Sequence, residues 1–525
     1  MYFKRKIIIL IILSLLLAGQ FCLAAELIPN DPDLAKQWYL SKLQMTNVWS
    51  METGQSNVVV AVIDSGVDVA HPDLRDNIWV NHREILGDNI DNDNNGFVDD
   101  INGWDFVEND NDPSPKFSTD CFSLGTCSKE AILHGTLVAG VISAIGNNNF
   151  GVSGITWKAK IMPLRVLSED GSGSTYDVVR AINYAIDNKA DIINLSFVGE
   201  TFDLLLEEAV NRAYQAGIVI VAAAGNENTD GHAINLDLRK MYPICQKGDN
   251  NENIIIGVGG SNANNQLSSF SNFGSSCIDV LAPGEDFWGT LVYKQGVDEL
   301  SNYFGGEYSG TSLAAPIVSG IAALIKSYKP ALNNNEIRDL ILNNTENIDA
   351  QNPAFVGKLG KGLVSPLKIF QTLRTSTGTA KLIKGSTQAV YYYGADGKRY
   401  VFPDKMSYFS WYQDFSELKT ISDSELAAIS LGGVVTYEPG SLVKISSLPQ
   451  VYAVSAGGVL RWVKTEELAA SLYGPNWASL VHDLADSFFI IYKMGSDIAT
   501  EADFNPTAER FNSSSIDVDK GLVNN

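Results

Sequence analysis

The sequence is poor in cationic side chains, cysteine and histidine. Lysine and arginine total 38 against 61 aspartates and glutamates, which gives a formal net charge of −23 over 525 residues. This deficit excludes nucleic acid or an anionic lipid surface as the main partner, because both are bound through cationic surface. An excess of carboxylates is compatible with metal ions. The five cysteines and five histidines form no Cys-x-x-Cys motif and no histidine pair, which disfavours a zinc site.

The chain also has few long apolar runs, and the one that stands out lies at its start. Lys4–Lys6 precede the apolar residues Ile7–Ala18, and small residues follow up to Ala24. A run of about a dozen residues is short for a membrane span, so the pattern predicts a signal peptide over 1–24, cleaved after Ala24. The alternative is an uncleaved membrane anchor. We therefore expect a secreted or cell-surface protein with no transmembrane span after cleavage.

Export would place the cysteines in an oxidising compartment. Cleavage removes Cys22 and leaves four cysteines, which allow three pairings. Pairing Cys121 with Cys127 and Cys245 with Cys277 is the simplest of the three. A bridge between Cys245 and Cys277 would stabilise the fold by roughly 3–4 kcal/mol on the loop-entropy model.

The length predicts two or more domains. In the first, short apolar β-branched runs alternate with helical patterns, as expected of strands buried on both faces and separated by helices. This alternation predicts an α/β fold with a doubly wound parallel sheet over residues 25–374. The expected strands are Val58–Ile63, Lys160–Val166, Asp191–Leu195, Ile218–Ala223 and Asn253–Val258, and the expected helices include Thr175–Asn188 and Leu204–Ala216.

Aromatic and β-branched residues dominate after a linker predicted at 375–387. Residues 388–402 and 450–463 are similar to each other, and each predicts two strands around a glycine turn. We therefore predict a smaller, duplicated, β-rich (α+β) module over 388–500 and a disordered tail over 501–525. This module resembles carboxy-terminal segments of secreted and envelope proteins of unassigned role. Its aromatic residues serve either core packing or a carbohydrate- or protein-binding surface, and they include Tyr391–Tyr393, Tyr400, Trp411 and Trp462.

Three motifs supply the parts that acyl transfer by a serine needs, namely a nucleophile, a base and a carboxylate that orients the base. Asp64 ends a buried strand, and catalytic groups of open α/β sheets collect at that edge. His134 opens the helical motif His-Gly-Thr-Leu-Val-Ala-Gly. Ser312 lies in Gly-Thr-Ser-Leu-Ala-Ala-Pro, at the positive end of a helix dipole.

In this order, the motifs resemble those of the subtilisin-like serine peptidases, and in pattern most of all the calcium-stabilised thermitase-like members. The resemblance implies that Ser312 is the nucleophile, His134 the general base and Asp64 its orienting carboxylate. A fourth match, Ala-Ala-Ala-Gly-Asn226, would present the Asn226 amide to the oxyanion. Most of the family carries a long propeptide. Here the residues after Ala24 lead almost directly into the enzyme-like start, so we expect folding without one or with help from elsewhere.

The resemblance also implies an endopeptidase of broad specificity, whose cleft binds an extended peptide between two strand-like walls. Val198 stands where the family commonly has glycine, which would narrow the pocket for the residue before the scissile bond. Glu227 either favours a basic side chain in that pocket or is a solvated glutamate. The candidate substrate contacts are Leu167, Gly171, Ser172, Gly173, Ser196, Phe197, Val198, Gly225 and Glu227.

Two structural calcium sites are expected. The first is an acidic loop with oxygens at alternate positions around a glycine, as in an EF-hand-like loop, and its alternative is a solvated acidic turn. The resemblance to heat-stable subtilases implies the second. Ligands in the acidic loop are Asp91, Asp93, Asn95 and Asp99; in the second site they are the side chains of Asp31, Asp73 and Asn148 and the carbonyl oxygens of Ile145, Phe150 and Val152.

The sequence thus predicts a secreted, calcium-stabilised serine endopeptidase that acts on proteins or peptides. The alternative is an inactive binding or scaffold protein at the cell surface, built on the same fold. The complete set of catalytic residues favours the enzyme.

Overall fold

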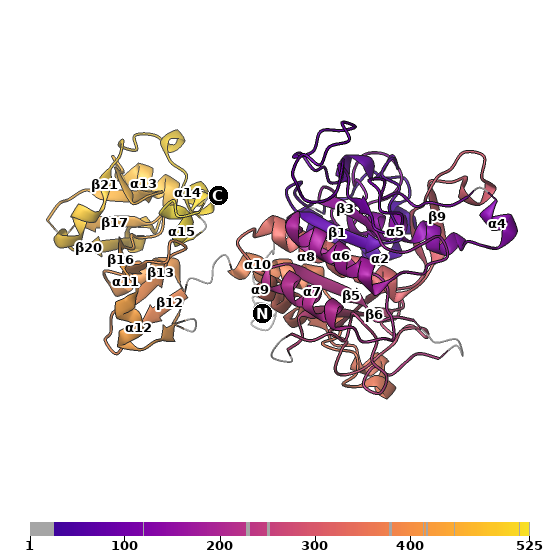
Figure 1. Ribbon diagram of the computed structural model, residues 1–525. Coiled ribbons are helices and arrows are strands. Elements are labelled where there is room, and N and C mark those ends of the chain that lie inside the picture. The colour runs from indigo at the N-terminus through magenta and orange to yellow at the C-terminus, as the bar shows by residue number, and fades with distance from the viewer. Residues whose placement is uncertain are drawn as a thin grey trace, which may run out of the picture. The chain divides into compact units, whose positions relative to one another are not determined.

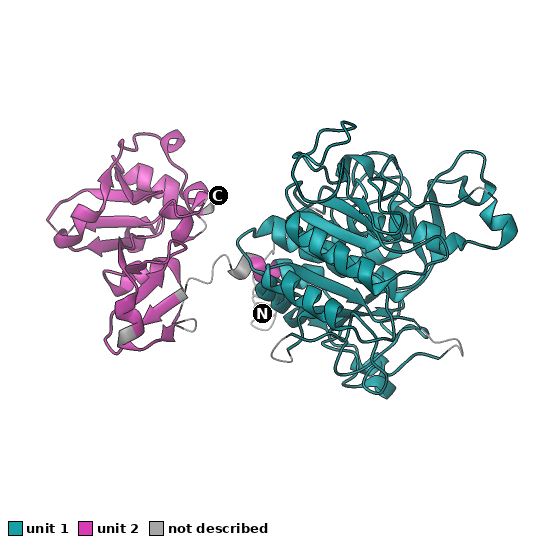
Figure 2. Ribbon diagram, in the orientation of Figure 1, with its two compact units in different colours: residues 1–370 teal, residues 371–525 magenta. Residues whose placement is uncertain are grey.

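The computed structural model describes residues 26–118, 120–226, 232–248, 252–376, 381–412, 414–415, 418–445, 447–513 and 515–523. The predicted signal peptide therefore lies outside the described residues. The chain divides into two units, Met1–Phe370 and Gln371–Asn525 (Figure 2). Among the described helices, Thr311–Tyr328 is the one long and apolar enough to cross a membrane, and 83% of its apolar window is buried inside the fold.

A nine-stranded sheet forms the centre of the first unit, in the order β10-β11-β7-β6-β5-β4-β1-β3-β2. All neighbours pair in parallel except β10 and β11. The five strands that the sequence predicts correspond to β1, β3, β4, β5 and β6. The strands are β1 (Val59–Asp64), β2 (Trp104–Asp105), β3 (Lys160–Arg165), β4 (Ile192–Leu195), β5 (Val219–Ala223), β6 (Ile255–Ser261), β7 (Val280–Pro283), β10 (Thr345–Glu346) and β11 (Leu363–Val364).

Helices cover both faces of this sheet, as the prediction of a doubly wound fold requires (Figure 1). α5 (Lys129–Ser143) and α8 (Thr311–Tyr328) pack against each other on one face, and α6 (Thr175–Asp187) and α7 (Leu204–Gln215) pack against each other on the opposite face. The shorter elements are α2 (Trp38–Lys42), α3 (Met45–Trp49), α4 (Cys121–Leu124), α9 (Asn334–Asn343), α10 (Pro366–Ser376) and the hairpin β8 (Phe287–Thr290) and β9 (Phe304–Tyr308).

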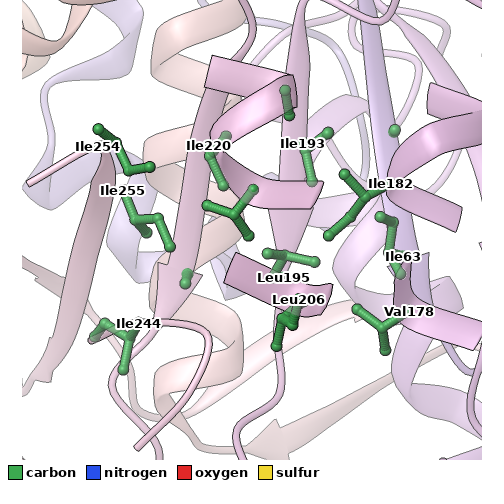
Figure 3. Packing of buried hydrophobic residues seen from close by; sticks show 14 of the residues in the cluster. Ile63, Val178, Ile182, Ile193, Leu195, Leu206, Ile220, Ile244, Ile254 and Ile255 are labelled. Carbon is green, nitrogen blue, oxygen red and sulfur yellow. The ribbon is translucent and has the colours of Figure 1, made fainter. Parts of the chain in front are cut away.

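Branched apolar side chains fill the layer between the sheet and helices α6 and α7. Figure 3 shows Val178 and Ile182 of α6 and Leu206 of α7 beside Ile63 and Leu195 of the sheet, and all five are buried. Burying each such side chain stabilises the fold by roughly 1.5–3 kcal/mol. The strands therefore form a rigid support for the residues that follow them.

Both expected disulfides are present. Cys121 bonds Cys127 with their Cα atoms 5.4 Å apart, and Cys245 bonds Cys277 with their Cα atoms 5.0 Å apart. The first closes the loop that leads into α5, and Ser128 then caps this helix by accepting a hydrogen bond from the Ala131 main-chain nitrogen.

The second unit contains two five-stranded sheets of the same topology. In each, three antiparallel strands form a meander, and a short strand pairs in parallel with each outer strand of the meander. The first sheet has β12 (Lys381–Lys384), β13 (Tyr391–Tyr393), β14 (Arg399–Val401), β15 (Lys419–Thr420) and β16 (Leu431–Val434), with α11 (Lys405–Trp411) and α12 (Asp423–Ala428). The second has β17 (Leu442–Ile445), β18 (Val451–Ser455), β19 (Val459–Trp462), β20 (Val481–Leu484) and β21 (Lys493–Met494), with α13 (Glu466–Tyr473).

The ends of this unit differ from the sequence prediction. β12 lies inside the segment predicted as a linker and pairs with β13. The segment predicted as a disordered tail instead contains α14 (Pro506–Asn512) and α15 (Ile516–Asp519). Its polar composition suggested disorder, but Ile516 is 1% exposed within the core of the first sheet.

Helix α15 also contacts a hairpin turn of each sheet. The Asp517 carboxylate accepts a hydrogen bond from the Ala395 main-chain nitrogen at 2.9 Å, in the turn between β13 and β14. The Asp519 carboxylate accepts one from the Gly457 main-chain nitrogen at 2.8 Å, in the turn between β18 and β19. α15 therefore joins the two sheets.

Candidate active site

Four of the residues singled out in the sequence follow neighbouring strands at one edge of the large sheet. In sheet order, Asn226 follows β5, Ser196 follows β4, Asp64 ends β1 and Leu167 follows β3. Because parallel strands all end at the same edge, this arrangement gathers their side chains there.

Asp64 and His134 form a hydrogen-bonded pair. Asp64 Oδ1 lies 2.7 Å from His134 Nδ1 and also accepts a hydrogen bond from the Ser65 main-chain nitrogen at 2.7 Å. The Asp64 side chain is fully buried, whereas that of His134 is 26% exposed. Since Nδ1 donates to the carboxylate, Nε2 is the proton acceptor of the neutral ring.

Electrostatics at this pair favour the protonated imidazole. Burial disfavours the charged ring, but the charge of Asp64 and its hydrogen bond outweigh burial and raise the pKa of His134 above its ordinary value. The pair can therefore take up a proton and hold it as an imidazolium.

Glycines allow α5 to approach β1 this closely. A Cβ on Gly135 would lie 2.2 Å from the Gly66 main-chain oxygen and 3.2 Å from Asp64 Oδ1. A Cβ on Gly140 would lie 2.0 Å from Thr290 Oγ1. A larger residue at Gly135 would push α5, and His134 with it, away from the end of β1, and a larger residue at Gly140 would push α5 away from β8.

Ser312 and Asn226 border one small space. Asn226 Oδ1 accepts hydrogen bonds from the Thr311 main-chain nitrogen at 3.0 Å and from Thr311 Oγ1 at 3.1 Å, which fixes the amide. A Cβ on Gly310 would lie 2.9 Å from Ser312 Oγ and 3.3 Å from Asn226 Nδ2. The hydroxyl oxygen and the amide donor thus face the same space, at the N-terminus of α8, where first-turn main-chain N–H groups lack partners within the helix.

A chain of buried polar groups holds the first turn of α8. Ser196 Oγ donates to the Ser312 carbonyl oxygen at 2.9 Å and accepts from Asn194 Nδ2 at 2.9 Å. Asn194 Oδ1 accepts from Ser319 Oγ at 2.8 Å. No role was predicted for Asn194 or Ser319, although one amide inside the apolar run Ile-Ile-Asn-Leu was a usable signal.

The two predicted substrate walls lie beside this site. Leu167 and Gly173 form an antiparallel bridge, and the Ser168 main-chain nitrogen donates to the Ser172 oxygen at 2.8 Å, so this wall is a narrow turn whose Gly171–Gly173 segment is exposed. The Ser128 main-chain nitrogen donates to the Glu169 oxygen at 2.8 Å and thereby ties the wall to the start of α5.

The opposite wall carries Val198 over Gly225. Gly225 has φ +80°, and a Cβ there would lie 2.7 Å from Val198 Cγ2. Gly199 exchanges two main-chain hydrogen bonds with Tyr242, at 2.7 and 2.8 Å. Glu227 lies outside the described residues.

The structure brings together the three side chains expected at the second calcium site. Asp31 and Asp73 are 4% and 0% exposed, and Asn148 Nδ2 donates to Asp73 Oδ1 at 2.7 Å. Burial raises the pKa of Asp73 to about 7, and the nearby charge of Asp31 adds to this. Two buried carboxylates without a basic partner fit a bound divalent cation.

The three residues expected to offer carbonyl oxygens lie on the same loop. The Ile145 main-chain nitrogen donates a hydrogen bond to the Asp73 carbonyl oxygen. The Phe150 nitrogen donates to Asn148 Oδ1, and the Val152 nitrogen donates to Asp73 Oδ2.

The acidic loop forms a different cluster from the one expected. Asp93 joins Glu84 and Asp100, with one carboxylate oxygen of each within 4.8 Å of the others. The Asp99 carboxylate instead accepts hydrogen bonds from Gly87 and Asn89 main-chain nitrogens. Asp91 and Asn95 likewise accept hydrogen bonds within the loop. The Asn95 and Gly96 main-chain nitrogens donate to the Asp91 carboxylate, and the Phe97 nitrogen donates to Asn95 Oδ1. The expected EF-hand-like ligand set therefore stays a prediction; of its four residues, Asp93 belongs to the carboxylate cluster and the others accept hydrogen bonds within the turn.

The new cluster has the chemistry of a hard-cation site. Burial raises the pKa of Asp100, which accepts a hydrogen bond from the Tyr184 hydroxyl at 2.5 Å. Arg83 Nη2 lies 3.0 Å from Asp93 and neutralises part of the charge. A further acidic group, Asp105, Glu108 and Asp110, is filled by the Lys116 ammonium, at 3.0, 3.4 and 2.5 Å.

Comparison with known proteins finds relatives for the first unit. The sequence model of the subtilase family matches residues 55–362. Subtilisin E of Bacillus subtilis (strain 168) is 35% identical over 300 residues, or 57% of this chain and 63% of that protein, so the match spans less than two thirds of its length. Thermitase of Thermoactinomyces vulgaris is 32% identical over 344 residues, or 65% of this chain and 99% of thermitase. In structure, a protease from Pseudoalteromonas arctica PAMC 21717 has a TM-score of 0.50 and 29% identity, with 66% of this chain and 99% of that chain covered.

Proposed function

The chain belongs to the subtilase family, and from this we propose that it is a secreted serine endopeptidase with Asp64, His134 and Ser312 as its catalytic triad. The observation that carries the proposal is the 2.7 Å contact between Asp64 and His134, at the sheet edge that also holds Asn226. The substrates proposed are proteins and peptides, bound with broad specificity because main-chain pairing with the two walls makes little demand on side chains.

The arrangement supports a two-step acyl transfer. Ser312 Oγ attacks the peptide carbonyl carbon while its proton passes to His134 Nε2. The oxyanion that forms accepts hydrogen bonds from Asn226 Nδ2 and the Ser312 main-chain N–H, aided by the positive end of the α8 dipole. His134 then gives its proton to the leaving amine, and a water molecule deprotonated by His134 releases the acyl group from Ser312.

Val198 and Glu227 are proposed to shape the pocket for the residue before the scissile bond. The position of Val198 supports this, because Val198 lies over Gly225. Gly225 precedes Glu227 by two residues in the chain. We expect Glu227→Gln to lower cleavage after lysine relative to phenylalanine and leucine in matched peptides. An unchanged ranking would remove the role of Glu227.

Calcium is proposed to bind structurally at two places, the site of Asp31, Asp73 and Asn148 and the cluster of Glu84, Asp93 and Asp100. The support is the burial of carboxylates at both. Calcium there would neutralise charge and hold the loops, and no step of the reaction needs it.

The proposed activity is tested by casein and peptide-library hydrolysis in calcium, with Ser312→Ala as the control. Loss of the triad serine lowers turnover by on the order of a millionfold, so activity should vanish in the variant. A folded, calcium-loaded protein without activity would favour the alternative, a binding or scaffold protein on this fold. Activity that survives in Ser312→Ala would overturn the assignment of the nucleophile.

A further inference from the structure

A pocket of about 240 Å³ lies in the second sheet of the C-terminal unit. It opens between the start of β18, the end of β19 and the start of α13; of these elements, Figure 1 labels α13. Trp462 and Trp477 line it with half-exposed indole rings, and Gln450, Lys464 and Glu466 add polar groups. We propose that this pocket binds one ring of a neutral polysaccharide.

In the first sheet, an aromatic side chain stands at the helix position that corresponds to Ala469. Tyr408 is the fourth residue after the N-cap of α11, as Ala469 is after the N-cap of α13. The Tyr408 ring is 2% exposed, stacks on Phe415 at 4.6 Å between centroids and lies 5.1 Å from Phe402. At this helix position the first sheet therefore carries a buried aromatic ring, whereas the second carries Ala469, a small residue that lines the pocket.

Most other aromatic side chains of the unit serve packing. Tyr392 and Tyr400 are buried in the first sheet's core, and Trp411 packs against that core and donates to the Thr436 oxygen at 2.8 Å. Trp462 and Trp477 are partly buried, as Trp411 is, and each also packs against a core of the second sheet, but both line the open pocket as well.

The polar groups favour a ring that carries hydroxyls. Gln450 Oε1 is buried and has no hydrogen-bond partner within the described part of the chain, so a hydroxyl that reaches it would satisfy this acceptor. An apolar peptide side chain would bury the polar groups of Gln450, Lys464 and Glu466 without forming hydrogen bonds to them, which costs free energy. A sugar instead presents C–H faces to the indoles and hydroxyls to the rim.

The charge and the volume of the pocket narrow the choice of ligand further. The Lys464 ammonium lies 2.5 Å from Asp497 and 4.1 Å from the Trp462 ring centroid, so its charge is already compensated. With Glu466 beside it, the pocket offers no unpaired cation for an acidic sugar. The volume is below the roughly 300–1,000 Å³ of pockets that enclose a whole drug-sized ligand, which suits one unit of a polymer.

The test is binding of the full chain, as the Ser312→Ala variant to prevent self-digestion, to insoluble cellulose, chitin, amylose and mannan. We expect retention on at least one of them, together with quenching of tryptophan fluorescence by the corresponding oligosaccharide. Ala469→Tyr should weaken this binding at least about tenfold, because the new ring occupies the pocket as Tyr408 does in the first sheet. Glu466→Gln and Glu467→Gln form a matched pair on α13, of which only the first should weaken binding.

Retention on none of the four polymers would overturn the proposal, as would full binding by a folded Ala469→Tyr variant. Preference for an acidic polysaccharide or for a peptide would overturn the neutral-sugar assignment. Gln450→Leu gives a second test if Ala469→Tyr fails to fold, since it removes an amide that has no partner at Oε1. Because binding is measured without peptidase activity, its failure leaves the proposed catalytic function untouched.

Discussion

His134 sets the pH at which the proposed site works, because only the neutral imidazole accepts the Ser312 proton. The charge of Asp64 raises the pKa of His134 above 6.5, against the effect of burial. We therefore expect kcat/KM for a peptide substrate to fall as pH drops through a value above 6.5, since this ratio reports the free enzyme. The measurement is a rate profile from pH 5 to pH 9.

Asp64→Asn provides the control for this profile. The amide removes the charge that raises the pKa and leaves the burial that lowers it, so the acidic limb should move to lower pH. Turnover should also fall by about 10⁴-fold. A wild-type limb below pH 6.5, or a limb that does not move in Asp64→Asn, would contradict this account.

Leu313, directly after the proposed nucleophile, offers peroxide no sulfur atom to oxidise. Its side chain is 2% exposed and contains no sulfur. We expect activity to persist in dilute hydrogen peroxide, whereas Leu313→Met should lose activity under the same conditions. The measurement is residual casein hydrolysis over time, and rapid loss in the unmodified protein would show that another residue is the oxidation target.

At the scale of elements, loops rather than strands carry the proposed calcium sites. Asp31, Asp73 and Asn148 join the N-terminal segment to the loop after α5, and binding at 100 times Kd stabilises the folded state by about 2.7 kcal/mol. At about 2–4 °C per kcal/mol for a domain of this size, a chelator should lower Tm by about 5–10 °C.

Calorimetry with and without chelator checks this expectation. Asp73→Asn and Asp100→Asn should each reduce the chelator effect. Glu108→Gln should keep it, because Lys116 already fills that acidic group. Equal Tm values with and without chelator would argue against both sites.

Elements with a strong local pattern could be predicted from the sequence. Strands β1 and β3 to β6 are apolar on both faces, and the motif around Ser312 places it at a helix start, whereas α5 already begins at Lys129, five residues before His134. What could not be predicted depends on contacts between distant residues. Glu84 joins Asp93 only through the fold of the acidic loop, and Ile516 is buried by strands more than eighty residues earlier in the chain.

The hydrogen bonds that hold the first turn of α8, where Ser312 lies, also depend on contacts between distant residues. Asn194 looks like a stray amide in an apolar strand until the packing of β4 against α8 brings Ser319 to it. Its role lies in a pairing that no local spacing encodes.

At the scale of the whole molecule, all proposed catalytic residues belong to the unit that ends at Phe370. This unit has its own sheet and core, so we expect a chain truncated after Ser376 to fold and to cleave soluble casein within about twofold of the full chain. Turnover and Tm of the truncated protein check this, and a large loss of either would show that the second unit supports the first.

Helix α15 affects the order in which the contacts of the second unit form during synthesis. Both sheets are complete by residue 494, yet the carboxylates that connect their turns come from Asp517 and Asp519. During synthesis these two contacts between the turns therefore form only after residues 517 and 519 have emerged. A chain that stalls or is clipped before residue 516 would lack this connection and would keep contacts such as the hydrogen bond from the Glu438 main-chain nitrogen to Ser410 Oγ at 3.0 Å, so we expect it to be cut by proteases more readily than the longer chain.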